Sequence, residues 1–252
     1  MGLISNILPS KKHLSQALNL GVLKVDMHSH LIPGIDDGVK TMEESLALIK
    51  AMKDFGYKKL ITTPHVMTDF YPNTTDTILK GLEEVKTALK KAEIDIEIEV
   101  AAEYLVDENF AKLVEKDDLL SFGDKYILIE LSYFQAAPNL HEIIFELQIK
   151  GYKIILAHPE RYIYWHNNWE EYTKLKDKDV FFQINMSSLT DYYGFPCRKA
   201  AEQMLKEKMV EFLGSDLHNS VYLQDITERV RFLKTMEKAI KSDKILNATL
   251  LK

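Results

Sequence analysis

Short apolar segments alternate regularly with amphipathic segments along this chain, and the alternation limits the folds available to it. Seven apolar runs have the length and the Ile, Val, Leu and Phe content of strands buried on both faces. They span residues 22–27, 59–63, 96–102, 126–131, 153–157, 180–185 and 210–214. Strands that alternate with helices predict a mainly parallel sheet with right-handed crossovers. One barrel-like α/β domain is the simplest interpretation, and an open doubly wound sheet is the alternative.

Five segments show the periodicity of amphipathic helices; they span residues 42–55, 76–92, 140–150, 198–208 and 226–241. Gly56 and Gly151 directly follow two of these segments, which is typical of a helix C-terminus. Asp225 lies three residues before Glu228, the spacing of a capping box, so we expect it to cap the last helix. No stretch rich in Gly, Ser or Pro divides the chain, which favours a single domain.

Composition excludes several classes of protein. The 252-residue chain is 46% hydrophobic and 28% charged, as expected of a globular protein with a sizeable core. Its net charge of −6 and its lack of a basic cluster argue against a nucleic-acid partner. Cys197 is the only cysteine, which excludes an intramolecular disulfide and favours a reducing compartment. Because no apolar run could span a bilayer and residues 1–23 do not resemble a signal peptide, we expect a cytoplasmic protein.

Histidines and acids follow nearly every predicted strand. In barrels of this kind, the C-terminal ends of the strands form the active face. His28 and His30 lie two residues apart at the end of the first strand, so their side chains point to the same side. Further candidates lie at later strand ends or in the loop after the first strand: Asp36, Asp37, His65, Glu103, Glu130, His158, Asp216 and His218. The sixth strand end, at residues 185–188, offers no strong ligand.

The residue types at these strand ends favour a metal centre. A lone His or Glu at a strand end is more often a hydrogen-bonded structural residue, but buried acids and histidines need something to neutralise them. Five of the eight histidines fall at strand ends. Their number, with the acids, exceeds the needs of one zinc ion, and clustered ions suit displacement at phosphorus. Mixed imidazole and carboxylate shells fit Mn, Fe or Zn equally.

Together the motifs resemble the polymerase-and-histidinol-phosphatase (PHP) family. They are His28-x-His30, Pro64-His65, Glu103, Glu130, His158-Pro159-Glu160-Arg161 and Asp216-x-His218. Within that family, residues 26–38, 62–65 and 214–218 are similar to the bacterial manganese-dependent protein tyrosine phosphatases of capsule and exopolysaccharide synthesis. The resemblance covers about residues 25 to 240. It implies a PHP-type, distorted seven-stranded (β/α)7 TIM-like barrel.

The resemblance also implies roles for individual residues. The metal ligands would be His28, His30, Asp37, His65, Glu103, Glu130, His158, Asp216 and His218, holding a cluster of three divalent ions with Mn preferred. Arg161 would bind phosphate and stabilise the transition state, and Arg198 matches a second family arginine by position. The phosphatase domain would span residues 25–252. Residues 1–24 would form an N-terminal extension, since shorter relatives begin almost at the His-x-His strand.

The implied activity is phosphomonoester hydrolysis, with the phosphorylated tail of a tyrosine kinase as the expected substrate. A metal-bound hydroxide would attack phosphorus directly, without a phosphoenzyme. A cysteine-dependent route is excluded, because the position six residues after Cys197, where its loop arginine would stand, holds Gln203. Cys197 is therefore expected to be a buried or neutral thiol.

Other functions remain open from the sequence. A histidinol-phosphatase or another small-molecule phosphatase would use the same metals with a narrower pocket. The net negative charge of the chain argues against a nuclease. The full set of candidate metal ligands argues against a non-catalytic scaffold. The tyrosine-rich residues 162–165 and 192–195 would line a cleft for a peptide or would pack as ordinary aromatic loops. The sequence is compatible with an oligomer as well as with a monomer.

Overall fold

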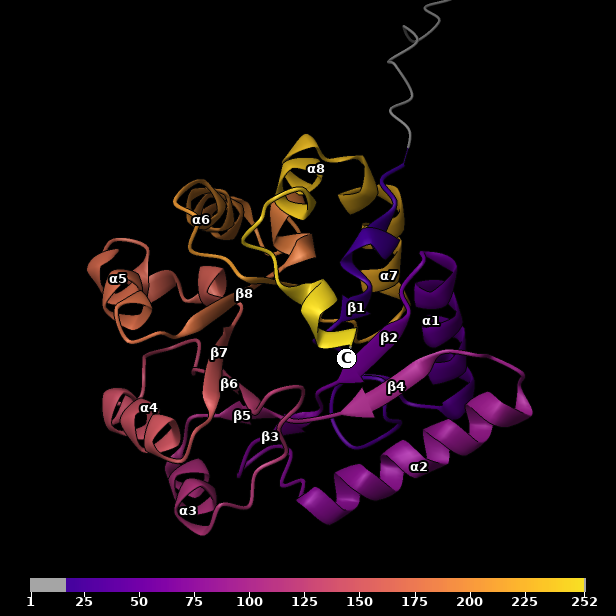
Figure 1. Cartoon of the computed structure of the whole chain (residues 1–252), viewed down its shortest axis with the longest axis horizontal. Helices are drawn as coiled ribbons and strands as arrows, with labels where there is room; N and C mark the ends of the chain where they lie inside the picture. The colour runs from indigo at the N-terminus through magenta and orange to yellow at the C-terminus, as the bar shows by residue number, and fades with distance from the viewer. Residues whose placement is uncertain (1–16, 252) are drawn as a thin grey trace, which may run out of the picture.

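Two parallel sheets form the centre of the computed structural model, which describes residues 17–251 (Figure 1). The first sheet has the order β1-β2-β4, with β1 (Val25–Asp26), β2 (Lys59–Thr62) and β4 (Glu97–Val100). The second has the order β3-β5-β6-β7-β8-β9, with β3 (His65–Val66), β5 (Glu103–Leu105), β6 (Tyr126–Glu130), β7 (Lys153–Ala157), β8 (Phe181–Asn185) and β9 (Phe212–Gly214). Every pairing between these strands is parallel, as the sequence predicts.

Backbone hydrogen bonds continue the strand order between the two sheets. Ala101 N donates to Thr62 O at 3.0 Å, where β2 and β4 end and β3 and β5 begin. At the other side, Asp216 N donates to His28 O at 2.9 Å, so the chain after β1 lies beside the chain after β9. The strand ladders form two sheets and not one closed barrel, so the architecture shown is a parallel α/β fold.

Helices surround the sheets (Figure 1). They are α1 (Met42–Asp54), α2 (Thr75–Lys91), α3 (Glu108–Lys116), α4 (Leu140–Ile149), α5 (Glu170–Lys176), α6 (Phe195–Lys206), α7 (Ser220–Glu228) and α8 (Lys234–Ile240). The first two begin at threonine caps: the Thr41 side chain accepts from Glu44 N, and Thr74 and Thr77 form a capping box. Within residues 17–251, no helix has both the length and the apolar composition to cross a membrane.

The predicted first strand and last helix differ from the structure. The first strand begins at Val25 instead of residue 22, because Leu20–Leu23 forms a 3₁₀ helix capped by the Asn19 side chain. The single helix predicted over 226–241 is wrong, since α7 ends at Glu228 and α8 begins only at Lys234. Asp225 is not a cap. It lies buried inside α7, and its carboxylate accepts hydrogen bonds from Thr190 and Arg229.

The predicted N-terminal extension over residues 1–24 lies mainly outside the described part of the chain, which begins at residue 17. Its described end packs on the C-terminal helices. Leu20 and Leu23 are buried, and Leu18 N donates to Arg231 O at 2.7 Å. Residues 17–24 are therefore continuous with the hydrophobic core.

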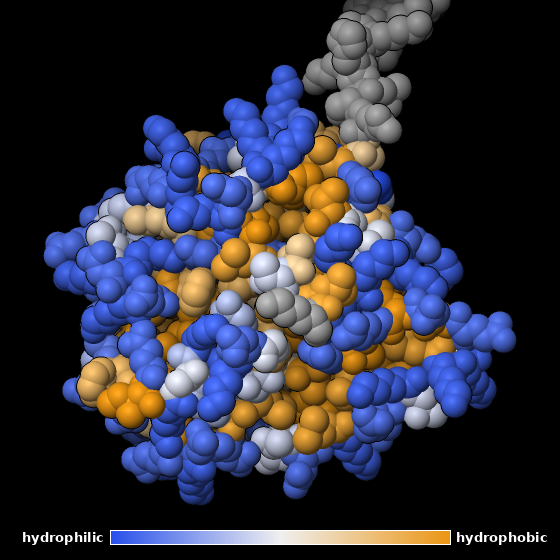
Figure 2. Space-filling view, in the orientation of Figure 1, coloured by the Kyte–Doolittle hydropathy of each residue, from blue (hydrophilic) through white to orange (hydrophobic). Residues whose placement is uncertain are grey.

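A separate apolar cluster contains residues from strands of both sheets. It contains Val25, Met27, Ile61, Ala101, Phe122, Tyr126, Leu128, Ile155, Ala157, Phe212 and Leu250. The 3₁₀ helix η6 (Asn247–Leu251) contributes Leu250 to this cluster and lies on the face shown in Figure 1. Figure 2 shows apolar residues near the middle of that face, bordered by hydrophilic side chains. Strands of both sheets and η6 thus share one apolar cluster.

Candidate metal centre

The C-terminal strand ends carry the expected histidines and acids in one place. His28 and His30 follow β1, His65 opens β3 directly after β2, and Glu103 opens β5 directly after β4. The others lie at the ends of β6, β7 and β9: Glu130, His158, Asp216 and His218. All eight are buried. Asp37, from the loop after β1, has a side chain that is 51% exposed and lies at the rim.

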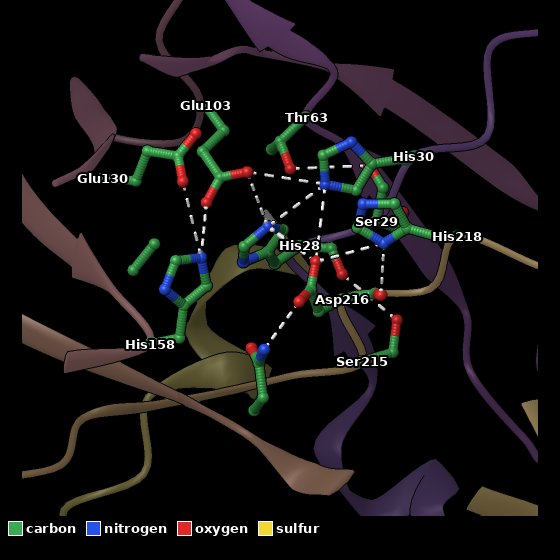
Figure 3. A network of polar contacts seen from close by, with 12 residues as sticks. His28, Ser29, His30, Thr63, Glu103, Glu130, His158, Ser215, Asp216 and His218 are labelled. Carbon is green, nitrogen blue, oxygen red and sulfur yellow. Dashed lines mark hydrogen bonds and ion pairs between the residues drawn. The ribbon is translucent and has the colours of Figure 1, made fainter. Parts of the chain in front are cut away.

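Glu103 lies at the centre of this group. Its Oε2 atom lies 3.2 Å from His28 Nε2 and 3.1 Å from His65 Nδ1. His158 Nε2 lies 2.9 Å from its Oε1 atom (Figure 3). Burial would raise the pKa of Glu103, but His28 and His65 together hold it well below its usual range. Burial and the charge of Glu103 raise the pKa of the neighbouring Glu130 carboxyl. One carboxylate therefore joins histidines from three strands.

Several buried polar atoms in the group make no hydrogen bond within the protein. They include His65 Nδ1, Glu103 Oε2 and Glu130 Oε1, although His65 Nδ1 lies only 2.9 Å from Glu130 Oε1. Atoms that bind the same cation are expected to lie close together without hydrogen-bond geometry. Because a buried polar group without a partner costs free energy, imidazole nitrogens and carboxylate oxygens in this arrangement fit divalent cations.

Three overlapping sets of side chains could hold an ion. They are His30, Asp37, His65 and His218; His28, His30 and Glu103; and His65, Glu103 and Glu130. In each set the candidate ligand atoms lie within 4.8 Å of one another. His30 and His65 each belong to two sets, so the sets form one continuous cluster.

Two further residues orient the first histidine pair, and the sequence interpretation did not assign them this role. His30 Nδ1 donates to Asp36 Oδ2, and His28 Nδ1 donates to Gln183 Oε1, both at 2.8 Å. These bonds leave Nε2 of each histidine for the cluster, as is typical of metal-ligating imidazoles. Gln183 could have been found from its polar side chain in the apolar strand β8, on the same face as Asn185.

Asp216 connects the cluster with the polar residues beside it. Its Oδ1 atom lies 3.3 Å from His28 Nε2, while Oδ2 accepts from Asn185 Nδ2 at 2.6 Å. Oδ2 also accepts from Tyr193 OH at 3.2 Å and from Arg161 at 3.4 Å. Burial opposes ionisation of Asp216, but His218 and His28 keep its pKa well below the usual range.

The backbone is left-handed at two of these positions. His158 has a φ of 34° and Asp216 has a φ of 51°. Residues other than glycine rarely adopt this region, because the Cβ atom crowds the backbone. The turns that follow β7 and β9 therefore hold their side chains toward the cluster at a conformational cost.

A cavity of about 140 Å³ opens above the cluster. It is lined by Asp37, His65, Met67, Tyr71, Glu130, Tyr133, His158, Arg161, Asp216, His218 and Tyr222. Arg161 lies at its wall and places a positive charge there. Arg198 does not line this cavity, and its Nε atom lies 3.0 Å from Asp191 Oδ1.

Cys197 and Glu160 have structural surroundings. Cys197 is buried in α6, and burial raises the pKa of its thiol. Glu160, in the His158–Arg161 motif, accepts hydrogen bonds from Asn185 N and Ser188 Oγ and so ties two loops together. Neither residue lines the cavity.

Fold and site together define a class: a parallel α/β protein whose strand ends carry a buried histidine and carboxylate cluster suited to metal ions. The particular family follows from the sequence comparison. The model of the capsular polysaccharide synthesis family CpsB/CapC matches residues 24–246, and the chain belongs to this family. The family resemblance seen in the sequence motifs is thus confirmed.

Named relatives agree with this membership. The chain is 28% identical to the tyrosine-protein phosphatase YwqE of Bacillus subtilis over 196 residues, 77% of each chain. It is 29% identical to the tyrosine-protein phosphatase CpsB of Streptococcus agalactiae over 201 residues, 77% of this chain and 83% of the relative. A solved structure from work on YwqE of Bacillus subtilis and CpsB of Streptococcus pneumoniae, described as unique metal-dependent tyrosine phosphatases, superposes with a TM-score of 0.76. That match has 25% identity and covers 90% of both chains.

Proposed function

We propose that this protein is a metal-dependent protein tyrosine phosphatase. The observation that carries the proposal is the buried cluster around Glu103, in which carboxylates and imidazoles converge with several hydrogen-bonding atoms unpaired. Relatives of the same family that are named tyrosine-protein phosphatases support the substrate class.

The ligands of the proposed metal cluster are the nine residues expected from the sequence. They are His28, His30, Asp37, His65, Glu103, Glu130, His158, Asp216 and His218. Three overlapping sets of candidate ligands support a cluster of three ions. Their mixed imidazole and carboxylate shell fits Mn, Fe or Zn, and the resemblance to manganese-dependent phosphatases favours Mn. When bound, such ions activate water and neutralise charge on phosphoryl oxygens.

The remaining side chains of the site bind and orient the substrate. Arg161 donates to the phosphoryl oxygens from the cavity wall, where its fixed charge stabilises the developing negative charge. Asp216 Oδ2 contacts the same guanidinium at 3.4 Å and limits its movement. Cys197 takes no part, since it is buried away from the cavity and its thiol has a raised pKa. The second phosphate-binding role expected of Arg198 stays a prediction.

The proposed substrate is a phosphotyrosine in the tail of a tyrosine kinase that acts in capsule or exopolysaccharide synthesis. The cavity, with Tyr71, Tyr133 and Tyr222 in its lining, supports an aromatic phosphoester. A cytoplasmic location, supported by the single cysteine, belongs to the same proposal.

The proposal also covers the finer architecture. The backbone hydrogen bonds from Ala101 to Thr62 and from Asp216 to His28 support a distorted seven-stranded arrangement of the PHP type. In it, β2 with β3 and β4 with β5 each count as one bent strand. The phosphatase domain would begin near residue 25, close to the first matched residue of the family model.

A metal-by-substrate panel tests the function. The purified protein is stripped of metal, reloaded with Mn, Fe or Zn, and assayed with a phosphotyrosine peptide, histidinol phosphate and single-stranded DNA. We expect hydrolysis of the peptide to exceed that of the other two by at least about tenfold in kcat/KM. Preference for histidinol phosphate would identify a small-molecule phosphatase, and cleavage of DNA a nuclease.

A further inference from the structure

Two tyrosine rings enclose the guanidinium group of Arg161. Its Cζ atom lies 4.6 Å from the ring centroid of Tyr133 and 4.2 Å from that of Tyr193. Tyr133 comes from the segment after β6, and Tyr193 from the segment between η4 (Met186–Thr190) and α6. Both separations fall within the range of cation–π contacts. The Arg161 guanidinium is therefore held between side chains from two segments that lie far apart in the sequence.

The edges of the guanidinium are much less engaged than its faces. Among the described residues, the hydrogen bond of the Arg161 side chain is a long one, from NH1 to Asp216 Oδ2 at 3.4 Å. An arginine has five N–H donors in the plane of the group, and stacking on the faces leaves those donors available. The Arg161 side chain is 20% exposed and lines the cavity.

Both tyrosines also contact proposed metal ligands. Tyr193 OH donates to Asp216 Oδ2 at 3.2 Å, while Oδ1 of the same carboxylate faces His28. The ring of Tyr133 stacks on that of His158, with centroids 6.0 Å apart and an interplanar angle of 29°. The position of the guanidinium is therefore fixed relative to the cluster from both sides.

We propose that Tyr133 and Tyr193 are positioning residues that hold Arg161 with its donor edge toward the phosphoryl group. The inference rests on the proposed function, in which Arg161 binds that group. An unrestrained arginine would lose considerable rotamer entropy on binding an anion, and the two rings remove that cost in advance. The geometry also fits bidentate donation to a tetrahedral anion.

Leucine and phenylalanine variants of the two tyrosines separate the ring from the hydroxyl. For the manganese-loaded protein, we expect Tyr133→Leu and Tyr193→Leu each to lower kcat/KM on a phosphotyrosine peptide by about 3- to 30-fold, the range of a partly desolvated cation–π contact. Tyr133→Phe keeps the ring and should recover most of the loss. Tyr193→Phe should recover less, because its contact with Asp216 is gone.

Phe134→Leu is the matched control. Phe134 lies next to Tyr133 in the chain, is 91% exposed, and has no ring contact with Arg161. This variant should keep kcat/KM within about twofold of the parent. Tyr133 is itself 45% exposed, so Tyr133→Leu tests the proposal even if Tyr193→Leu does not fold.

A double-mutant cycle with Arg161→Ala distinguishes positioning from general packing. Binding of inorganic phosphate to the manganese-loaded variants is measured by calorimetry, together with kcat/KM. If the tyrosines act through Arg161, Tyr133→Leu weakens phosphate binding about 3- to 30-fold in the parent and has no further effect in Arg161→Ala. Equal losses in both backgrounds would overturn the inference.

The cycle also separates this inference from the proposed function. If the parent fails to hydrolyse phosphotyrosine peptides, the proposed function is wrong. Phosphate binding that depends on Tyr133 only when Arg161 is present would still support the positioning role. A phosphatase that is active on the peptide but insensitive to Tyr133→Leu would leave the function intact and remove the inference.

Discussion

At the N-terminal ends of β2 and β4, the buried ammonium group of Lys59 lies 3.2 Å from Glu97 and 2.8 Å from Glu99. At the C-terminal ends of the same strands, His65 and Glu103 lie 3.1 Å apart without hydrogen-bond geometry. Lys59 is 1% exposed, yet both of its acidic partners remain partly in water. In contrast, the side chains of His65 and Glu103 are nearly or fully buried.

The difference shows how the same strands serve stability at one end and chemistry at the other. A buried charge with partners can belong to an ordinary core, as Lys59 does. Buried acids and histidines whose polar atoms lack partners within the protein need a bound partner from outside the chain, such as a metal ion. The contrast between paired and unpaired charge, and not the number of charges, therefore identifies the functional end.

Of the changes that test this contrast, removal of the metal ions should have the largest effect. Dialysis against a chelator at neutral pH should abolish phosphatase activity and lower the melting temperature, because the cluster then has no counter-charge. Added Mn should restore both. Activity is measured with a phosphotyrosine peptide, and unfolding by calorimetry. Full activity after chelation, with metal content checked by mass spectrometry, would refute the metal centre.

Glu103→Gln should have the next largest effect, because it removes the carboxylate that joins the histidines. We expect kcat/KM to fall at least about 100-fold, with weaker metal binding. Glu99→Gln makes the same chemical change at the opposite strand end, where Glu97 still pairs with Lys59. It should stay within about twofold of the parent. Equal losses in the two variants would show that the cluster has no special role.

Loss of both acids beside Lys59, at the N-terminal ends of β2 and β4, should affect stability instead of catalysis. Glu97→Gln combined with Glu99→Gln leaves the Lys59 ammonium buried without a carboxylate partner. The free energy of unfolding should fall by about 3 kcal/mol, measured in urea, while kcat of the folded protein is retained. Adding Lys59→Met removes the buried charge and should recover part of the loss. A fall in kcat instead would link this end to the reaction.

Cys197→Ala should have the smallest effect on activity. The thiol is buried in α6 and does not line the cavity, so kcat/KM should stay within about twofold of the parent. Treatment with a thiol-alkylating reagent should likewise leave the rate unchanged. Loss of activity in the variant, with its fold intact by circular dichroism, would favour a cysteine-dependent reaction.

Apolar runs and strand-end residues made much of the fold and the site predictable. All seven predicted strands occur, and the spacing of His28 and His30 correctly placed both side chains in one space. The bends at Thr63–Pro64 and Ala101–Ala102, which start β3 and β5, were not predicted. They depend on backbone pairing between distant strands, which no local pattern encodes.

The parts that were missed depend on tertiary contacts. Helix α7 ends at Glu228, and Asp225 inside it is buried against Thr190, a residue 35 positions away. The apolar periodicity over residues 226–241 gave no sign of this break. The hydrogen bonds of Gln183 to His28 and of Asp36 to His30 depend on the tertiary positions of the imidazoles. Gln183 alone left a local signal, a polar side chain in an apolar strand. The pair of rings around Arg161 likewise joins residues from separate segments.

The left-handed backbone at His158 and Asp216 has an evolutionary consequence. Each such residue costs about 1–3 kcal/mol that the rest of the fold must supply. Glycine would relieve the backbone cost at either turn but would remove a candidate metal ligand. Among proteins that share this fold, a change at either turn would be an early mark of a lineage released from the reaction, while the strands and helices persisted.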